Sequence, residues 1–304
     1  MRTVLITGGG GFTGRHIIRR LVESGRTVVS YNRNYAAADD PRVIAAQGEL
    51  FDIPRLMHVL QQHKVDAIVH TAAMSHPTLS LDVPVGTFAA NVEGTLGVLE
   101  AARVTGVRRV VNFSSETVYG RADGPVDEGT PVAPSTPYAV TKVATEWLGH
   151  VYKARYSVEV VSLRIAQVYG PGNKMPEVLG DMLKSVRDSR RFVLDRGGDH
   201  GFNFIYADDV ATATLAALAA QGPFALPAYN VSSAEYWRLA DAADLARRLL
   251  PEAKIEIGHG PVPELDLRGP FAIGEARRAL GFEPYWTLER GLADYVDWLR
   301  THDA

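Results

Sequence analysis

Residues 4–14 read VLITGGGGFTG, a short apolar run followed at once by a glycine-rich turn. Its glycines recur at three-residue intervals before a helical pattern begins. A strand-to-helix turn without side chains lets backbone N–H groups approach a pyrophosphate, whose charge is favoured by the helix N-terminus. A glycine at the end of the turn also lets helix and strand pack closely. The stretch predicts a dinucleotide-binding turn formed by Gly8, Gly11, Phe12, Thr13 and Gly14.

Short β-branched runs alternate with longer helical patterns through the first half of the chain. The runs cover residues 4–7, 27–31, 43–45, 67–70, 109–114 and 158–164. Such alternation predicts βαβ units and a parallel sheet. Parallel strands need crossovers of a dozen or more residues, and helical patterns such as 14–24 and 87–105 supply them. We therefore expect a doubly wound α/β fold of the Rossmann type.

The pattern becomes less regular after residue 170. Helices are expected at 176–188, 208–220, 238–250 and 288–300, between short strands and turns rich in glycine and proline. We predict a dinucleotide-binding domain at 1–170 and a smaller, mixed α/β lobe at 171–304 that mainly binds substrate. Segments near 204–230 are expected to return to the first domain.

Composition excludes several classes of function. The 304 residues carry a net charge of -3 without a Lys/Arg cluster, so a nucleic-acid partner is not expected. The absence of cysteine rules out disulfides, thiolate metal sites and a cysteine nucleophile. The apolar run so close to Met1 leaves no room for a signal peptide, and the alanine-rich stretch 210–220 is too short to cross a bilayer. We expect a cytoplasmic protein without a membrane partner or a metal.

The residues after the second predicted strand bear on the choice of cofactor. An acidic residue about 20 positions after the glycines binds the ribose hydroxyls in NAD-binding folds. This chain has Asn32 and Arg33 there. A guanidinium can pair with a 2′-phosphate that a carboxylate would repel. The pair favours NADP over NAD, and the alternative is that Arg33 is an ordinary surface charge.

A candidate catalytic group lies in the middle of the chain. Tyr138 and Lys142 are four residues apart, and hence on one face of the predicted helix. A nearby cation stabilises a phenolate and lowers its pKa from about 10, which makes the tyrosine a better base. Ser115 follows the strand at 109–114 and brings a hydroxyl to the carboxyl edge of the sheet, where doubly wound folds bind ligands.

The chain resembles the extended short-chain dehydrogenase/reductase family, the NAD(P)-dependent epimerases and dehydratases, many of which act on nucleotide sugars. The motifs that carry the resemblance are TGGGGFTG at 7–14, HTAA at 70–73, NVEGT at 91–95, SSETVYG at 114–120, PYAVTK at 137–142, RIAQVYGPG at 164–172 and YADDVA at 206–211. It implies that Tyr138 is the acid/base, Lys142 its activator and a ribose ligand, and Ser115 the hydrogen-bond partner of the reacting oxygen.

Further contacts and an assembly follow from the same resemblance. The cofactor contacts it implies outside the glycine turn and the catalytic group come from Asn32, Arg33, Glu49, Leu50, Thr71, Ala72, Ala73, Asn91 and Ile165. His70 would lie beside the cofactor without donating a proton. A homodimer is expected, paired through the helices near 87–105 and 138–156.

Several positions depart from the family pattern. Dehydratases carry Asp-Glu after the catalytic hydroxyl, whereas this chain has Glu116 and Thr117. Adjacent residues of an extended segment face opposite ways, so Glu116 is not expected to replace that glutamate. Gln167 and Phe202 stand where nucleotide-sugar enzymes commonly place an asparagine and an arginine for the pyrophosphate. Either Arg268 or another cation takes this role, or the substrate has no diphosphate. The candidate substrate contacts are His76, Glu116, Thr117, Gln167, Phe202 and Arg268.

Two enzymatic functions remain open at this point. The first is a sugar or nucleotide-sugar epimerase that works by transient oxidation to a keto intermediate. The second is a dehydrogenase or reductase of a free sugar, sugar acid or other small carbonyl compound, with net redox turnover. A binding module without catalysis is a third possibility, which the presence of Ser115, Tyr138 and Lys142 disfavours.

Overall fold

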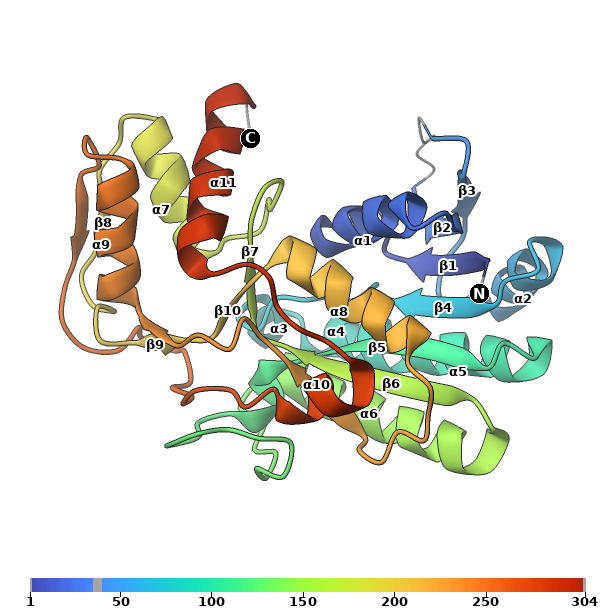
Figure 1. Ribbon diagram of the computed structural model, residues 1–304. Helices are drawn as coiled ribbons and strands as arrows, with labels where there is room; N and C mark the ends of the chain where they lie inside the picture. The colour runs from blue at the N-terminus through green and yellow to red at the C-terminus, as the bar shows by residue number, and fades with distance from the viewer. Residues whose placement is uncertain (1, 35–39, 303–304) are drawn as a thin grey trace.

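A parallel β-sheet of seven strands forms the centre of the molecule (Figure 1). The computed structural model describes residues 2–34 and 40–302. The strands lie in the order β11-β6-β5-β4-β1-β2-β3. Their bounds are Thr3–Thr7 (β1), Thr27–Asn32 (β2), Val43–Gln47 (β3), Ala67–His70 (β4), Arg109–Ser115 (β5), Glu159–Ile165 (β6) and Ala228–Val231 (β11). The prediction of a doubly wound parallel sheet is confirmed.

Helices cover both faces of this sheet. The first layer contains α1 (Phe12–Glu23), α8 (Ala207–Ala219) and α10 (Gly274–Leu280), and the second contains α2 (Ile53–Gln62), α5 (Gly94–Thr105) and α6 (Pro137–Tyr156). Because successive strand side chains point to opposite faces, Val4 and Ile6 of β1 pack in the first layer and Leu5 packs in the second. All three are fully buried, as expected for a sheet covered on both sides.

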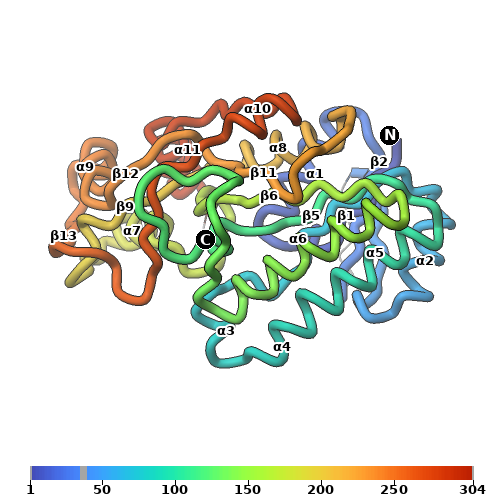
Figure 2. Tube along the Cα trace, turned by 90° about the horizontal axis from the view of Figure 1, so that it is seen from below, coloured from blue at the N-terminus to red at the C-terminus, as the bar shows by residue number. Residues whose placement is uncertain are grey.

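The helix that carries Tyr138 has well-defined ends. Thr136 is the N-cap of α6, and its hydroxyl accepts a hydrogen bond of 3.2 Å from the backbone N–H of Ala139. Pro137 occupies the first helical position, where its missing N–H costs nothing. The helix ends at Tyr156, and its C-cap Ser157 has a left-handed backbone with a φ of 56°. Figure 2 shows α6 running beside α5.

The helical segment before α5 contains an irregular turn. It runs through α3 (Leu79–Asp82), α4 (Pro84–Phe88) and a π-helical turn, η1 (Ala89–Glu93), before it continues as α5. Turns of this type are frequent at functional sites. Here the turn contains Asn91, whose side chain is buried between α6 and the loop after β4.

A smaller lobe extends from one end of the sheet (Figure 1). Its helices are α7 (Val178–Arg187), α9 (Leu239–Leu249) and α11 (Leu288–Thr301), which share one apolar core. Its strands form short pairs: β7 (Gln167–Tyr169) with β10 (Phe204–Tyr206), β8 (Phe192–Leu194) with β13 (Ile255–Ile257), and β9 (Gly201–Phe202) with β12 (Trp237–Arg238).

The chain passes between the two parts more often than the division at residue 170 implies. β11 pairs with β6 in the main sheet, and α8 packs beside α1. α10 also lies on the main domain, because Ile273, Ala276 and Leu280 are buried in the same core as α8. α10 thus lies on the main domain in addition to the segments near 204–230 that were expected there.

Candidate active site

Ser115 ends β5, an inner strand of the sheet, at the carboxyl edge. Its hydroxyl oxygen accepts hydrogen bonds from the backbone N–H of Thr117 at 3.2 Å and from the hydroxyl of Thr117 at 3.0 Å. Residues Glu116–Tyr119 form a turn of 3-10 helix, η2, directly after the strand. The turn reverses the direction of the chain, so that residues 115–117 lie close together.

The phenol of Tyr138 is buried beside Ser115. The backbone N–H of Tyr138 donates a hydrogen bond of 3.1 Å to the hydroxyl of Ser80, which connects the start of α6 to α3. Burial raises the pKa of Tyr138 to about 12, and a hydrogen bond with Ser115 opposes this rise. Tyr138 is therefore a neutral phenol at pH 7 in this structure, the form that donates a proton.

Lys142 lies one helical turn further along α6. Its Nζ donates a hydrogen bond of 2.6 Å to the backbone carbonyl of Phe113 and is 5.5 Å from the centre of the Tyr138 ring. Burial lowers the pKa of Lys142 to about 8, although the carboxylate of Glu146 acts in the opposite direction. The ammonium is thus close to the phenol, as the four-residue spacing predicted, but the expected fall in the pKa of Tyr138 is not seen, because burial raises it.

A buried ion pair supports this group from behind, and the sequence did not reveal it. Arg164 donates two hydrogen bonds to the carboxylate of Glu146, at 2.9 and 2.7 Å, and a third of 2.8 Å to the hydroxyl of Tyr119. The hydroxyl of Ser114 donates to the same carboxylate. The pair therefore links α6 to β5 and β6 beside the candidate catalytic residues.

The glycine turn is packed too closely for side chains. A Cβ at Gly14 would lie 2.4 Å from the carbonyl oxygen of Gly8. A Cβ at Gly8, whose φ is 73°, would lie 2.8 Å from the N–H nitrogen of Ala72 and from the hydroxyl oxygen of Thr71. Gly11 caps the N-terminus of α1. The turn thus keeps its backbone bare at a helix N-terminus, which fits a dinucleotide phosphate.

Asn32 is tied to the glycine turn. Its side-chain oxygen accepts a hydrogen bond of 3.2 Å from the N–H of Gly10, and its amide group donates one of 2.8 Å to Ser30. Arg33 follows with an exposed side chain. Glu49 and Leu50 lie two and three residues after Gln47, the last residue of the neighbouring strand β3.

The remaining predicted cofactor contacts also lie along this edge. Thr71 to Ala73 follow β4, and the hydroxyl of Thr71 donates a hydrogen bond of 2.8 Å to the carbonyl of Thr7. The amide of Asn91 holds the backbone of Met74 and donates a hydrogen bond of 2.9 Å to Thr141. Ile165 ends β6 beside Ser115. The sheet thus brings residues from six strand ends together at one edge.

His70 is part of the protein interior. Its ring lies 2.8 Å from the hydroxyl of Thr7 and 3.0 Å from that of Thr95. Burial, together with the charge of Lys142, lowers the pKa of His70 to about 3. The imidazole is therefore neutral at physiological pH.

A cavity of about 60 Å³ is lined in part by Thr117, whose hydroxyl donates a hydrogen bond to Ser115. We call it the Arg268 cavity. Five of the six predicted substrate contacts line it, and its full lining is Pro77, Glu116, Thr117, Gln167, His200, Gly201, Phe202, Asn203, Leu265, Asp266 and Arg268. The sequence did not indicate that Asp266 or Pro77 would line this cavity, because neither residue lies in one of the family motifs.

The expected orientation of Glu116 was wrong. That expectation assumed an extended segment, whereas residues 116–119 form a 3-10 turn, and both Glu116 and Thr117 line the same cavity. The argument that Glu116 cannot replace the dehydratase glutamate therefore no longer holds. Thr117, which stands at the position of that glutamate, has no carboxylate to remove a proton.

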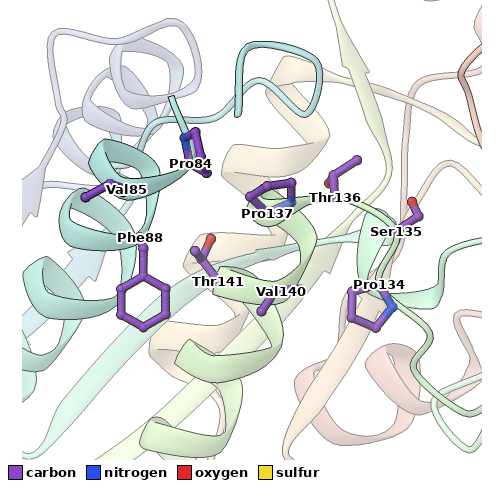
Figure 3. A pocket seen from close by; sticks show the side chains of 9 residues that line it. All are labelled: Pro84, Val85, Phe88, Pro134, Ser135, Thr136, Pro137, Val140 and Thr141. Carbon is purple, nitrogen blue, oxygen red and sulfur yellow. The ribbon is translucent and has the colours of Figure 1, made fainter. Parts of the chain in front are cut away.

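His76 is the sixth predicted substrate contact, and the structure does not place it in the Arg268 cavity. Its Nδ1 accepts a hydrogen bond of 3.3 Å from the N–H of Leu79, at the start of α3. A second and larger hollow, of about 490 Å³, lies on the outer side of α4 and α6 (Figure 3). Pro84, Val85 and Phe88 form one wall, and Pro137 and Val140 belong to the other.

Backbone hydrogen bonds connect the loop after η2 to the segment that carries Arg268. Ala122 donates to the carbonyl of Leu267 at 3.0 Å and accepts from Gly269 at 3.1 Å. Val126 donates to the carbonyl of Pro270 at 2.9 Å. One wall of the cavity is therefore fixed to the chain that directly follows Ser115 and Glu116.

Within residues 2–34 and 40–302, no cluster of three or more histidine, aspartate or glutamate side chains could hold a metal ion. None of the helices there is both long enough and apolar enough to cross a membrane.

Known proteins resemble this chain over nearly its whole length. The mouse dTDP-D-glucose 4,6-dehydratase is 29% identical over 98% of this chain and 89% of its own length. The UDP-glucose 4-epimerase of Lacticaseibacillus casei is 28% identical over 99% and 97%. The UDP-glucose 4-epimerase of Thermus thermophilus, solved in complex with NAD, superposes with a TM-score of 0.87 at 25% identity and covers 98% of this chain and 99% of that one.

The sequence motifs, the sheet order and these similarities agree. Residues 4–232, which include the glycine turn, Ser115, Tyr138 and Lys142, match the NAD dependent epimerase/dehydratase family. The chain therefore belongs to this family of extended short-chain dehydrogenases/reductases, and it is an enzyme.

Proposed function

We propose that this enzyme epimerises a carbohydrate by transient oxidation of one alcohol to a ketone, with Ser115, Tyr138 and Lys142 as its catalytic residues. The observation that carries the proposal is the meeting of these three side chains at the carboxyl edge of the sheet, beside a cavity that Thr117 lines. A nicotinamide dinucleotide held by the glycine turn would supply the hydride acceptor and donor.

The three residues divide the work on the proton. Ser115 holds the reacting oxygen by a hydrogen bond, and Tyr138 takes the alcohol proton in the oxidation and returns it in the reduction. The positive charge of Lys142, 5.5 Å from the phenol ring, favours the phenolate that the oxidation needs. Burial favours the neutral phenol that the reduction needs. An epimerase needs both forms within one turnover.

The test of this proposal uses Tyr138→Phe. Loss of the hydroxyl should lower the rate of hydride transfer by about 10²- to 10⁴-fold, because the proton loses its acceptor while the ring still fills its place. Hydride transfer is followed by stopped-flow absorbance at the nicotinamide band, and cofactor binding by calorimetry. Tyr152→Phe on the same helix, whose hydroxyl contacts Glu100, is the matched control and should keep its activity. Equal rates for Tyr138→Phe and wild type would exclude the catalytic role.

Net redox turnover is the second candidate, favoured by the single arginine in the Arg268 cavity, which already faces two carboxylates. Such a cavity suits a free sugar or sugar acid whose product leaves after oxidation. An epimerase interconverts two sugars in an NMR spectrum without net change at the nicotinamide band, whereas a dehydrogenase changes this absorbance in proportion to turnover. A single incubation with both readouts separates the two.

We propose NADP as the cofactor, with NAD as the alternative. Arg33 supports NADP because it is exposed and directly follows Asn32, the last residue of β2, whose side chain contacts the glycine turn. The Thermus epimerase contains NAD, which supports the alternative. Calorimetric titration of both cofactors into wild type and Arg33→Ala decides between them. NADP binding should weaken in the variant while NAD binding stays similar, and tighter binding of NAD by the wild type would reverse the choice.

We also propose that the enzyme forms a homodimer through α4, α5 and α6. Their outer sides carry exposed apolar side chains, which we call the helix-pair surface: Val85, Phe88, Leu96, Val140, Trp147 and Val151. The larger hollow lies at one end of this surface (Figure 3). Contiguous apolar patches of this kind mark interaction sites, and a second copy would cover it with the same helices.

A further inference from the structure

Arg268 is the only arginine or lysine among the described residues that line the Arg268 cavity. Its guanidinium lies 3.6 Å from the carboxylate of Glu116 and 3.8 Å from that of Asp266, and it donates a hydrogen bond of 3.0 Å to the carbonyl of Gly120. Burial raises the pKa of Glu116, although Arg268 opposes this rise. The positive charge of Arg268 and the negative charge of Asp266 cancel. The cavity therefore has no net positive charge, whether or not Glu116 is protonated.

The wall formed by His200, Phe202 and Asn203 supplies no cation either. Phe202 lies with its ring centre 4.5 Å from that of His200 and 5.0 Å from that of Phe204. Burial lowers the pKa of His200 to about 4, so its imidazole is neutral at pH 7. The amide of Asn203 is occupied by the carbonyl of Gly269 and the N–H of Phe271, at 3.0 and 2.9 Å. This wall is neutral and largely apolar.

We infer that the substrate is a carbohydrate without a diphosphate group, in contrast to the sugar nucleotides named for the similar enzymes. The inference rests on the proposed function. A substrate whose alcohol contacts Ser115 and Tyr138 would place the rest of its structure toward the adjacent Arg268 cavity. A buried diphosphate needs cations or charge-assisted hydrogen bonds to replace its water. The cavity instead presents two carboxylates, one arginine that they already engage, and the phenyl ring of Phe202.

The same walls suit a smaller polyhydroxylated ligand. The amide of Gln167 can donate to sugar hydroxyls and accept from them, and the hydroxyl oxygen of Thr117 and the carboxylates of Glu116 and Asp266 can accept from them. Phe202 adds an apolar side chain to the lining, against which the C–H groups of a sugar can pack. A neutral sugar and a sugar acid share this chemistry, and they differ in whether a carboxylate displaces Glu116 from Arg268.

Calorimetric titration with UDP and dTDP tests the inference without any requirement for turnover. The cofactor-loaded wild type should bind neither nucleotide at millimolar concentration. Phe202→Arg should bind UDP about tenfold or more tightly than wild type does, because it adds a cation to the neutral wall. Phe202→Leu keeps the wall apolar and should gain no UDP binding. Gln167→Lys adds a cation from the neighbouring strand β7, and it serves in place of Phe202→Arg if that variant does not fold.

An activity panel completes the test. Free sugars, polyols and sugar acids should turn over with the cofactor, and nucleotide sugars should not. Micromolar binding of UDP by the wild type, or faster turnover of any nucleotide sugar than of the free compounds, would overturn the inference. If no compound turns over, the proposed catalytic function fails, while the nucleotide titration still decides whether the cavity accepts a diphosphate. Preference for sugar acids over neutral sugars would assign Arg268 to the substrate carboxylate.

Discussion

At the scale of single residues, His70 makes stability depend on pH. Its pKa is about 3 in the folded protein and about 6.5 in an unfolded chain, so only the unfolded state binds this proton between those values. The free energy of unfolding should therefore fall as the pH drops from 6.5 toward 3, by up to about 1.4 kcal/mol per pH unit from this residue. Guanidinium unfolding of wild type and His70→Gln between pH 7 and 5 measures the difference in slope. The exposed His58→Gln is the control, and equal slopes in all three proteins would refute the assignment.

At the scale of secondary-structure elements, the β1–α1 unit depends on a glycine that no side chain can replace. Gly14→Ala should lower the free energy of unfolding by about 1–3 kcal/mol and weaken cofactor binding, because its Cβ would lie 2.4 Å from the carbonyl oxygen of Gly8. A Cβ at Gly10 meets no closer atom than the side-chain oxygen of Asn32 at 3.9 Å. Gly10→Ala should therefore change stability little in the same thermal and chemical unfolding measurements. Similar losses in both variants would show that the turn is sensitive to any substitution.

At the scale of the whole molecule, the helix-pair surface should hold two copies together. Trp147→Asp places a charge on the outer side of α6, where the side chain is 57% exposed, and should shift the protein from dimer to monomer. Light scattering over a dilution series measures the mass against 33.1 kDa for one chain. Val193→Asp, on a strand of the smaller lobe with 54% exposure, is the control and should remain dimeric. A wild type that is already monomeric at high concentration would contradict the proposed dimer.

The parts of the molecule differ in how far the sequence predicts them. The strands and the glycine turn were predicted because β-branched runs and glycines are local signals, and the sheet then collects their ends at one edge. The ion pair between Glu146 and Arg164 was not predicted, since nothing in the sequence indicates that two charged residues on separate elements will pair in the interior. The 3-10 turn at 116–119 and the return of α10 to the main domain also depend on packing between distant segments.

The backbone bonds between residues 122–126 and 267–270 join two segments far apart in the chain into one structural unit. One segment follows Ser115 and Glu116, and the other contains Arg268. Gly269 approaches so closely that a Cβ there would lie 1.8 Å from the carbonyl oxygen of Gly124. An insertion or a changed length in either segment would break this register and displace Arg268. Anyone who redesigns this enzyme for a new substrate would therefore need to exchange both segments together, as a single cassette made of two pieces of chain.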